Sequence, residues 1–465
     1  MNKVINPIFI VSIILWCFIT LVRVFHHCPW YDESHAWAIA QELNIFEIFK
    51  YMKIEGHTFL WYLLLMPIAK TNFMYPYSML LLNWIFCFIS VLILWVKSPF
   101  NNWIKVLITF SFPFFALYSV IARCYAVGIM FLFILISMDK VKLKYPVLYS
   151  FLLILCANTS LMGCVPATVL GVRFACDLIK DKQNVLIPFS IAGFGAVLIL
   201  LQLFGCVESG LSIYTNNDTL FSAVLRSLKY NSFYYWMLIS FVTLILSIIF
   251  YIKNKIFPSF LLFTLLLLAG IFCVYAGRIW HLFFIYIYFI CSCWLVLIRP
   301  NSNEYKFKAC LSLALIIVSF ACILYRPVDV DSKMIFKNNK SSMAKEFLAD
   351  ANLENAVIIL SRQFDTSIQP YLKYSSIKLV NYCSNEVLNY DTTDYLSSEN
   401  CRLDTVLDSA LIRLDKRVFD KWYSDKLYLL TNKLKLIGIE QNFGYKFTLY
   451  KKNGENYLWK VEKVK

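Results

Sequence analysis

Long apolar runs alternate with short polar loops through most of the chain. A membrane-spanning helix needs roughly 17–25 mostly apolar residues, and eleven runs approach this pattern. They predict spans near residues 5–24, 77–96, 103–121, 124–138, 146–160, 161–176, 185–205, 233–252, 257–276, 279–298 and 309–325. A further apolar run at 57–70 is short for a span, and the pattern leaves open whether it is re-entrant or spanning.

Positive charges between the apolar runs predict the orientation, because loops rich in Lys and Arg stay cytoplasmic. If 57–70 does not span and the amino terminus is inside, the short outer loops hold Arg123, Arg226, Lys229 and Arg278. The inner loops then hold the larger set: Lys97, Lys105, Lys140, Lys142, Lys144, Arg173, Lys180, Lys182, Lys253, Lys255, Arg299, Lys306 and Lys308. We therefore predict a multi-pass integral membrane protein with a cytoplasmic amino terminus and an extracytoplasmic tail.

The tail after residue 325 carries charged residues at the density of a soluble domain. Its pattern predicts a helix over Ser341–Leu348 and strands over Ala356–Leu360, Leu427–Thr431 and Tyr445–Tyr450. The sequence thus predicts a transmembrane domain over 1–325 and a small soluble α/β domain over 326–465. Cys383 and Cys401 would be able to pair in an extracellular tail, and the sequence leaves this open.

The composition supports the membrane assignment. The chain is 60% hydrophobic and 16% charged, whereas soluble domains carry about 25% charged residues. The formal net charge of +15 lies mostly between apolar segments, where it sets topology. We therefore expect membrane lipids as surroundings and no nucleic-acid partner.

The first outer loop, at about 25–76, contains an acidic pair directly after the first span. Asp32 and Glu33 are flanked by aromatic residues, and the apolar positions that follow Ser34 have helical spacing. This pattern predicts an amphipathic helix lying in the membrane interface, with both carboxylates at its amino terminus. Such carboxylates would lie near the lipid headgroups.

Cationic residues are expected at the same height. Arg123 and Arg278 each begin an apolar run, beside Tyr125 and His281. Ionisable groups at membrane depth are costly and are usually paired or functional. They either snorkel to the interface or bind an anionic group there. A carboxylate that takes a proton and an arginine that stabilises a leaving phosphate suit sugar transfer from a lipid phosphate.

Three short segments resemble motifs of one enzyme family. The stretch Tyr31–Ala40 (YDESHAWAIA) resembles the Asp-Glu signature in the first outer loop of GT-C glycosyltransferases, in the bacterial protein-O-mannosyltransferase-like group that includes the lipid A aminoarabinose transferase. Glu55–Tyr62 (EGHTFLWY) resembles that group's Gly-His-Pro-Pro-Leu-Tyr-Tyr element, with Thr58-Phe59 in place of Pro-Pro. Ala122–Ala126 (ARCYA) resembles its Arg-x-Tyr.

The resemblance implies a GT-C-like fold and a glycosyltransferase that inverts the anomeric carbon of a polyprenyl-phosphate-sugar donor. It implies that Asp32, with Glu33 beside it, is catalytic, and that His57, Arg123 and Tyr125 line the donor-phosphate site. No motif contains Arg278. We add it to the donor-phosphate set only because it is expected at headgroup depth on the outer side of the membrane. Whether the enzyme uses a divalent metal is left open; its ligands would be Asp32, His35 and His57. The acceptor would be a glycan, lipid or protein, and a bacterial plasma membrane is the expected location.

Two other classes fit the same layout. A transporter or flippase of lipid-linked sugars would also have many spans and outer cations, but the sequence shows no inverted repeat. An O-antigen polymerase or ligase would also use a lipid-linked donor, although such enzymes usually carry one large late loop. Here the acidic pair comes early and the late segment is a folded tail.

Overall fold

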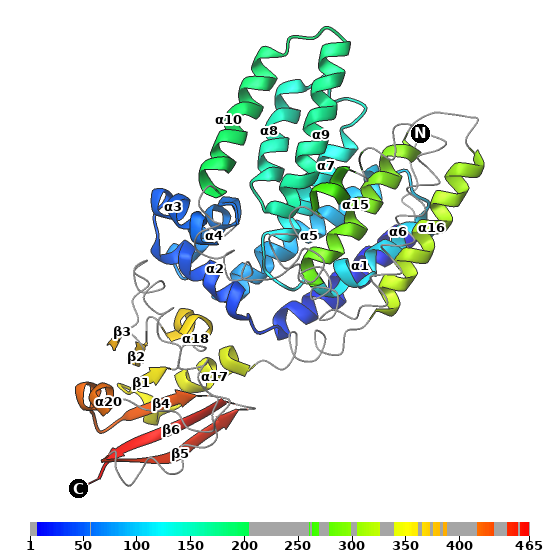
Figure 1. Ribbon diagram of the computed structural model, residues 1–465. Helices are drawn as coiled ribbons and strands as arrows, with labels where there is room; N and C mark the ends of the chain where they lie inside the picture. The colour runs from blue at the N-terminus through cyan, green and yellow to red at the C-terminus, as the bar shows by residue number, and fades with distance from the viewer. Residues whose placement is uncertain are drawn as a thin grey trace, which may run out of the picture. The chain divides into compact units, whose positions relative to one another are not determined.

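The computed structural model describes most of the chain, namely residues 7–55, 57–203, 260, 263–268, 279–298, 305–325, 339–360, 365–372, 375–381, 385–387, 416–431, 444–453 and 456–464. It is mostly helical and has a small sheet near the carboxyl terminus (Figure 1). The chain divides into two compact units. The second unit combines His27–Leu43 and Met66–Pro76 with the tail from Ser332, and the first unit comprises the other described residues.

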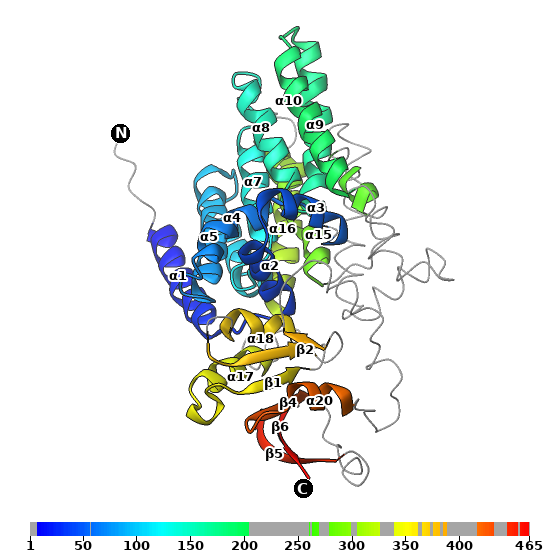
Figure 2. The same cartoon turned by 90° about the vertical axis from the view of Figure 1, so that its left-hand side faces the viewer.

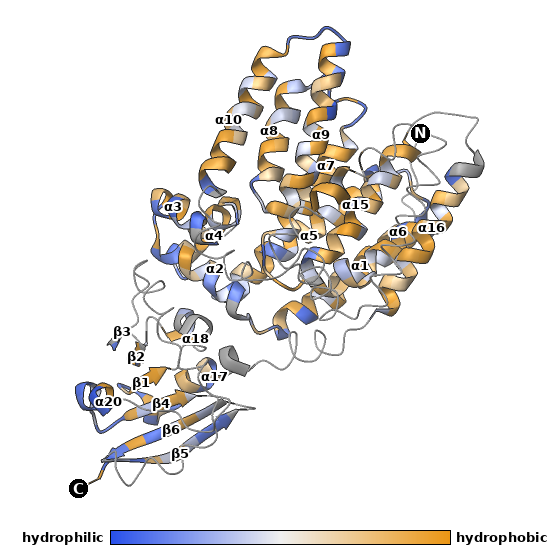
Figure 3. Cartoon of the chain, viewed as in Figure 1, coloured by the Kyte–Doolittle hydropathy of each residue, from blue (hydrophilic) through white to orange (hydrophobic). Residues whose placement is uncertain are grey.

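Most of the helices that precede the tail are apolar along most of their length, whereas α2 and α3 also carry many polar residues (Figure 3). They are α1 Pro7–His26, α2 Tyr31–Glu42, α3 Ile45–Glu55, α4 Leu60–Lys70, α5 Tyr77–Lys97, α6 Asn102–Thr109, α7 Tyr125–Ser137, α8 Pro146–Ala157, α9 Leu161–Lys180, α10 Leu186–Leu203, α15 Ile279–Leu297 and α16 Tyr305–Leu324. Among the described residues, four helices are long and apolar enough to cross a membrane: α1, α5, α9 and α15. This mostly helical structure fits a membrane protein.

The structure agrees with some predicted spans and differs at others. The apolar run 103–121 does not form one helix: α6 ends at Thr109, and a π-helical turn, η1, follows over Pro113–Leu117. Pro113 has no N–H to continue the helix, which explains the break. The predicted span 233–252 lies outside the described residues, as does most of 257–276. The count of eleven spans thus stays a prediction.

The ambiguous run at 57–70 forms α4, a helix of 11 residues. At about 1.5 Å per residue such a helix is too short for a hydrocarbon core of about 30 Å. Its start is held by neighbouring helices, because the side-chain oxygen of Gln202 accepts from the Phe59 N–H at 2.9 Å and the Asn158 carbonyl accepts from the Leu60 N–H at 3.2 Å. Gln202 also donates to the Asn158 side chain at 3.1 Å. The start of α4 is thus bound to α8 and α10.

Helices α8 and α9 form a tight hairpin through the turn 158–160. Ser160 caps α9, since its Oγ accepts from the Gly163 N–H at 3.2 Å. Thr159 donates to the Cys156 carbonyl at 2.7 Å. A methyl group on Gly163 would meet both the Cys156 carbonyl and the Thr159 hydroxyl. Glycine is therefore required there by close packing.

The tail folds as an α/β layer structure. Its six-stranded sheet has the order β3-β2-β1-β4-β6-β5, with parallel pairing of β1 to β2 and to β4 and antiparallel pairing elsewhere. The strands are β1 Val357–Leu360, β2 Lys378–Asn381, β3 Glu386–Val387, β4 Leu427–Thr431, β5 Tyr445–Asn453 and β6 Asn456–Lys463. The predicted strand Leu427–Thr431 matches β4, and the other two predicted strands correspond to β1 and β5.

Helices cover both faces of this sheet (Figure 2). Alternate strand residues such as Ile358 and Leu430 pack with α17 Asn339–Leu348 and α18 Asp365–Leu372. The residues between them, such as Ile359 and Leu429, pack with α20 Lys416–Trp422. Strands buried on both faces explain the continuous apolar runs in the sequence. Cys383 and Cys401 lie outside the described residues.

We predict that Gly163→Ala destabilises the helical unit by about 1–3 kcal/mol, because the added methyl group overpacks the hairpin. Gly193→Ala is the matched control: it lies in α10 with nothing within 4 Å of the added carbon, so it should be neutral or stabilising. Thermal unfolding in detergent measures both. Equal midpoints for the two variants would contradict the packing of the α8–α9 hairpin.

Candidate functional site

The acidic pair lies in the first turn of α2. Trp30 is the N-cap residue, so Asp32 and Glu33 occupy the second and third helical positions. Negative side chains are favoured there because the first N–H groups of a helix lack intrahelical partners. The structure therefore places both carboxylates at the helix start, where the sequence predicts them.

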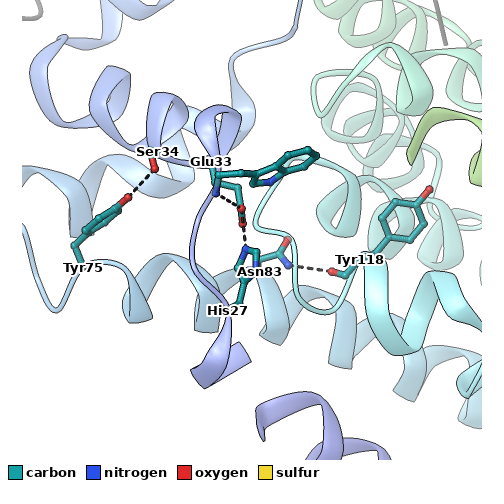
Figure 4. Close-up of polar contacts among 7 residues, drawn as sticks. His27, Glu33, Ser34, Tyr75, Asn83 and Tyr118 are labelled. Atoms are coloured by element: carbon teal, nitrogen blue, oxygen red, sulfur yellow. Dashed lines mark hydrogen bonds and ion pairs between the residues drawn. The ribbon is translucent and has the colours of Figure 1, made fainter. Parts of the chain in front are cut away.

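Glu33 is fully engaged within the protein. Its Oε2 lies 2.8 Å from His27 Nε2 and accepts from the Trp30 N–H at 3.0 Å (Figure 4). The second contact is the carboxylate half of a capping box. Glu33 is 0% and His27 2% exposed. Because a buried carboxylate must be hydrogen-bonded, these contacts hold Glu33 in one place.

Asp32 differs from its neighbour in burial. Its side chain is half-buried, whereas Glu33 and His35 are buried. Residues adjacent in an α-helix point about 100° apart. Of the two carboxylates, Asp32 is thus the one with exposed surface for a reacting molecule.

The helix carrying the pair is not the amphipathic interfacial helix that the sequence predicts. Every residue from Glu33 to Gln41 is buried, and α2 packs against α18 of the tail. The predicted helix also ends early, because Leu43 is extended and Asn44 starts α3 by accepting from the N–H groups of Phe46 and Glu47. The prediction was wrong because the apolar spacing reflects burial within the protein.

Arg123 and His57 come together in the first unit. Arg123 precedes α7, is 7% exposed, and its Nη2 lies 3.1 Å from His57 Nε2. Since a guanidinium only donates, the histidine ring accepts at Nε2 and is neutral. The two residues that the motifs assign to one site are therefore adjacent, and the pair itself carries one positive charge.

Two side chains that the sequence analysis did not select lie beside this pair. Tyr62 donates to Glu55 Oε2 at 2.9 Å, and Arg123 lies within electrostatic reach of Tyr62. Both residues belong to the segment Glu55–Tyr62 that carries the second motif. The second motif was the available signal for them, since Glu55 ends α3 and Tyr62 lies in α4.

Tyr125 contacts α15. Its hydroxyl lies 2.9 Å from His281 Nε2, and the two rings meet edge to face at 5.6 Å. Tyr118 donates to the Trp280 carbonyl at 2.7 Å and so also contacts the start of α15. His281 is buried. Arg278, the predicted neighbour of His281, lies outside the described residues.

The predicted metal ligands do not form a three-ligand group. In the part of the chain that the structure describes, no three His, Cys, Asp or Glu side chains gather as a metal site requires. Asp32 and His35 belong to the second unit and His57 to the first. A divalent metal therefore stays a prediction.

We predict that Glu33→Ala lowers the free energy of unfolding by about 2–4 kcal/mol, because it removes a helix cap and the partner of buried His27. Asp32→Asn should cost less than Glu33→Ala, because the amide keeps the shape of the side chain and the position is only half-buried. Unfolding of both purified variants in detergent checks this. A larger loss for Asp32→Asn than for Glu33→Ala would contradict the different roles of the two carboxylates.

No protein-family model matches the chain, and no curated protein is significantly similar to it in sequence. A function must therefore be argued from the geometry of these side chains and from the short motifs that contain them.

Proposed function

We propose that the chain is an integral membrane glycosyltransferase that moves a sugar from a polyprenyl-phosphate donor to an acceptor on the outer face, with inversion. The observation that carries this proposal is the division of roles in the acidic pair: Glu33 is bound to His27 and Trp30, and Asp32 keeps exposed surface. A half-buried carboxylate on a firmly anchored helix suits a general base.

The proposed reaction is a single displacement. The acceptor hydroxyl attacks the anomeric carbon and transfers its proton to Asp32, a step that a positioned base accelerates by roughly 10²–10⁴-fold. The bond between that carbon and the phosphate oxygen breaks as the new glycosidic bond forms. Polyprenyl phosphate leaves as a monoester anion and takes up the electron pair. Glu33 positions the helix and does not exchange a proton.

The pair of Arg123 and His57 is the proposed binding group for the donor phosphate. A guanidinium suits phosphate because its donors match two oxygens at once. Its bond to His57 at 3.1 Å orients the guanidinium. Tyr125 and Arg278 complete the proposed donor-phosphate set, with Tyr125 acting through His281.

The proposal places the chain in the plasma membrane of a bacterium, with its amino terminus cytoplasmic and its tail outside. The acceptor is a glycan, a lipid or a protein. The four long apolar helices support membrane insertion, and the layered α/β tail supports a domain in water.

Replacing the base tests the function. We predict that Asp32→Asn lowers the transfer of labelled hexose from polyprenyl phosphate to an envelope fraction by at least about 10²-fold, because the amide cannot accept a proton. Glu42→Gln, in the last turn of the same helix, should keep wild-type activity. Label that moves equally with wild type and Asp32→Asn would remove Asp32 from the mechanism and favour a transporter of lipid-linked sugars.

Replacing the cation tests the phosphate site. We predict that Arg123→Lys lowers kcat/KM for the donor by about 10²–10³-fold, because lysine lacks the planar fork with which a guanidinium binds two oxygens in parallel. Arg173→Lys is the matched control, since Arg173 pairs with Asp139 at 2.9 Å in a separate ion cluster. Initial rates at varied donor concentration measure both. Equal rates for Arg123→Lys and wild type would exclude Arg123 from donor binding.

A further inference from the structure

The helix that carries the acidic pair is held by a segment distant in sequence. The turn before α5 contacts α2 near both of its ends: Ser34 Oγ lies 3.0 Å from the Tyr75 hydroxyl, and Gln41 donates to the Asn72 side chain at 3.3 Å. Ser34 is fully buried. All four residues belong to the second unit, together with the tail.

Tyr75 is the point at which this segment meets the tail. Its ring lies 4.9 Å from Trp37 of α2 and, edge on, 4.8 Å from Tyr371 of α18. Lys345 of α17 lies over the Tyr371 ring at 5.9 Å. Aromatic pairs at such distances contribute beyond their buried area. One tyrosine therefore contacts both the carboxylate helix and a helix of the tail sheet.

The contacts of Ser34 and Glu33 fix the first turn of α2 from two sides. Figure 4 shows Ser34 directed toward Tyr75 and Glu33 directed toward His27. Asp32 precedes both residues. With two sides held, the first turn cannot rotate about the helix axis without breaking a buried hydrogen bond. A reacting group needs such support, because catalytic geometry tolerates only about 0.5 Å and 10–20°.

Burial raises the pKa of the Tyr75 hydroxyl, and Glu33 raises it further, while the Ser34 hydrogen bond opposes the shift. The phenol therefore stays protonated over the physiological pH range. Its contact with Ser34 is a hydrogen bond between two neutral hydroxyls, and it does not depend on pH in that range.

We infer that Tyr75 is a positioning residue for Asp32 and that it connects the carboxylate helix to the tail through Tyr371. This inference rests on the proposed function, in which Asp32 is the base. The tail is then part of the catalytic apparatus: the Tyr371 ring supports Tyr75, Tyr75 holds Ser34, and Ser34 fixes the turn that carries Asp32.

A double-mutant cycle tests the hydroxyl contact. Tyr75→Phe keeps both ring contacts and removes only the hydroxyl, and Ser34→Ala removes the partner. Each should lower kcat by about ten- to a hundredfold through misplacement of the base, with KM for the donor unchanged. The double variant should match either single variant, because all three lack the same bond. Tyr77→Phe, at the start of α5, is the control and should keep wild-type kcat.

Additive losses in the double variant, or a change in KM with kcat preserved, would overturn the inference. Either result would show that the two hydroxyls act separately or serve donor binding. A purely structural role for the bond would lower the amount of folded protein without changing kcat per folded molecule, and active-site titration separates these cases.

Hydrogen exchange tests the same inference without reference to activity. In Tyr75→Phe, the amides of α2 should exchange faster than in wild type, and those of α5 should not change. Tyr371→Leu should have the same effect on α2, whereas Tyr371→Phe, which keeps the ring, should not. If exchange in α2 responds while Asp32→Asn keeps full transfer activity, the proposed function fails and the connection to the tail stands. Unchanged exchange in Tyr371→Leu would overturn the role of the tail.

Discussion

A carboxylate without exposed surface must find its hydrogen-bond partners inside the protein, and this constraint on Glu33 shapes the region around the acidic pair. The His27 ring and the Trp30 N–H satisfy it at 2.8 and 3.0 Å. Asp32 is thereby left as the carboxylate with exposed surface, and the proposed chemistry depends on that difference.

The tail belongs to the same compact unit as the helix of the acidic pair. A long first outer loop and a distant carboxy-terminal domain would ordinarily be regarded as separate modules, yet His27–Leu43 and Met66–Pro76 belong to one compact unit with the sheet domain. Tyr75 contacts both α2 and α18 in that unit. Under the proposed function, a domain that holds the helix of Asp32 would explain why the enzyme keeps this tail.

The sequence predicted elements whose signals are local. Strand β4 and helices α5 and α15 follow from continuous apolar runs, and the carboxylates at the start of α2 follow from helical spacing. It failed where a single residue breaks a run, as Pro113 does within 103–121. The prediction of an amphipathic helix also failed for α2, because its apolar residues at helical spacing are buried within the protein. Contacts between distant segments leave no local signal, so the Ser34–Tyr75 bond was not predictable. The bond between Glu33 and His27, six residues earlier, was not predicted either. The adjacency of His57 and Arg123 was expected only through the motifs.

The central claim is that Asp32 takes the proton of the acceptor hydroxyl and does not hold the fold or the donor. The most direct measurement is the affinity of purified Asp32→Asn for a polyprenyl-phosphate hexose in nanodiscs, compared with that of wild type. The account predicts affinities within about twofold of each other, because removing a group that acts only in the transition state leaves ground-state binding unchanged. A loss of donor affinity as large as the loss of turnover would contradict it and would make Asp32 a binding or structural residue.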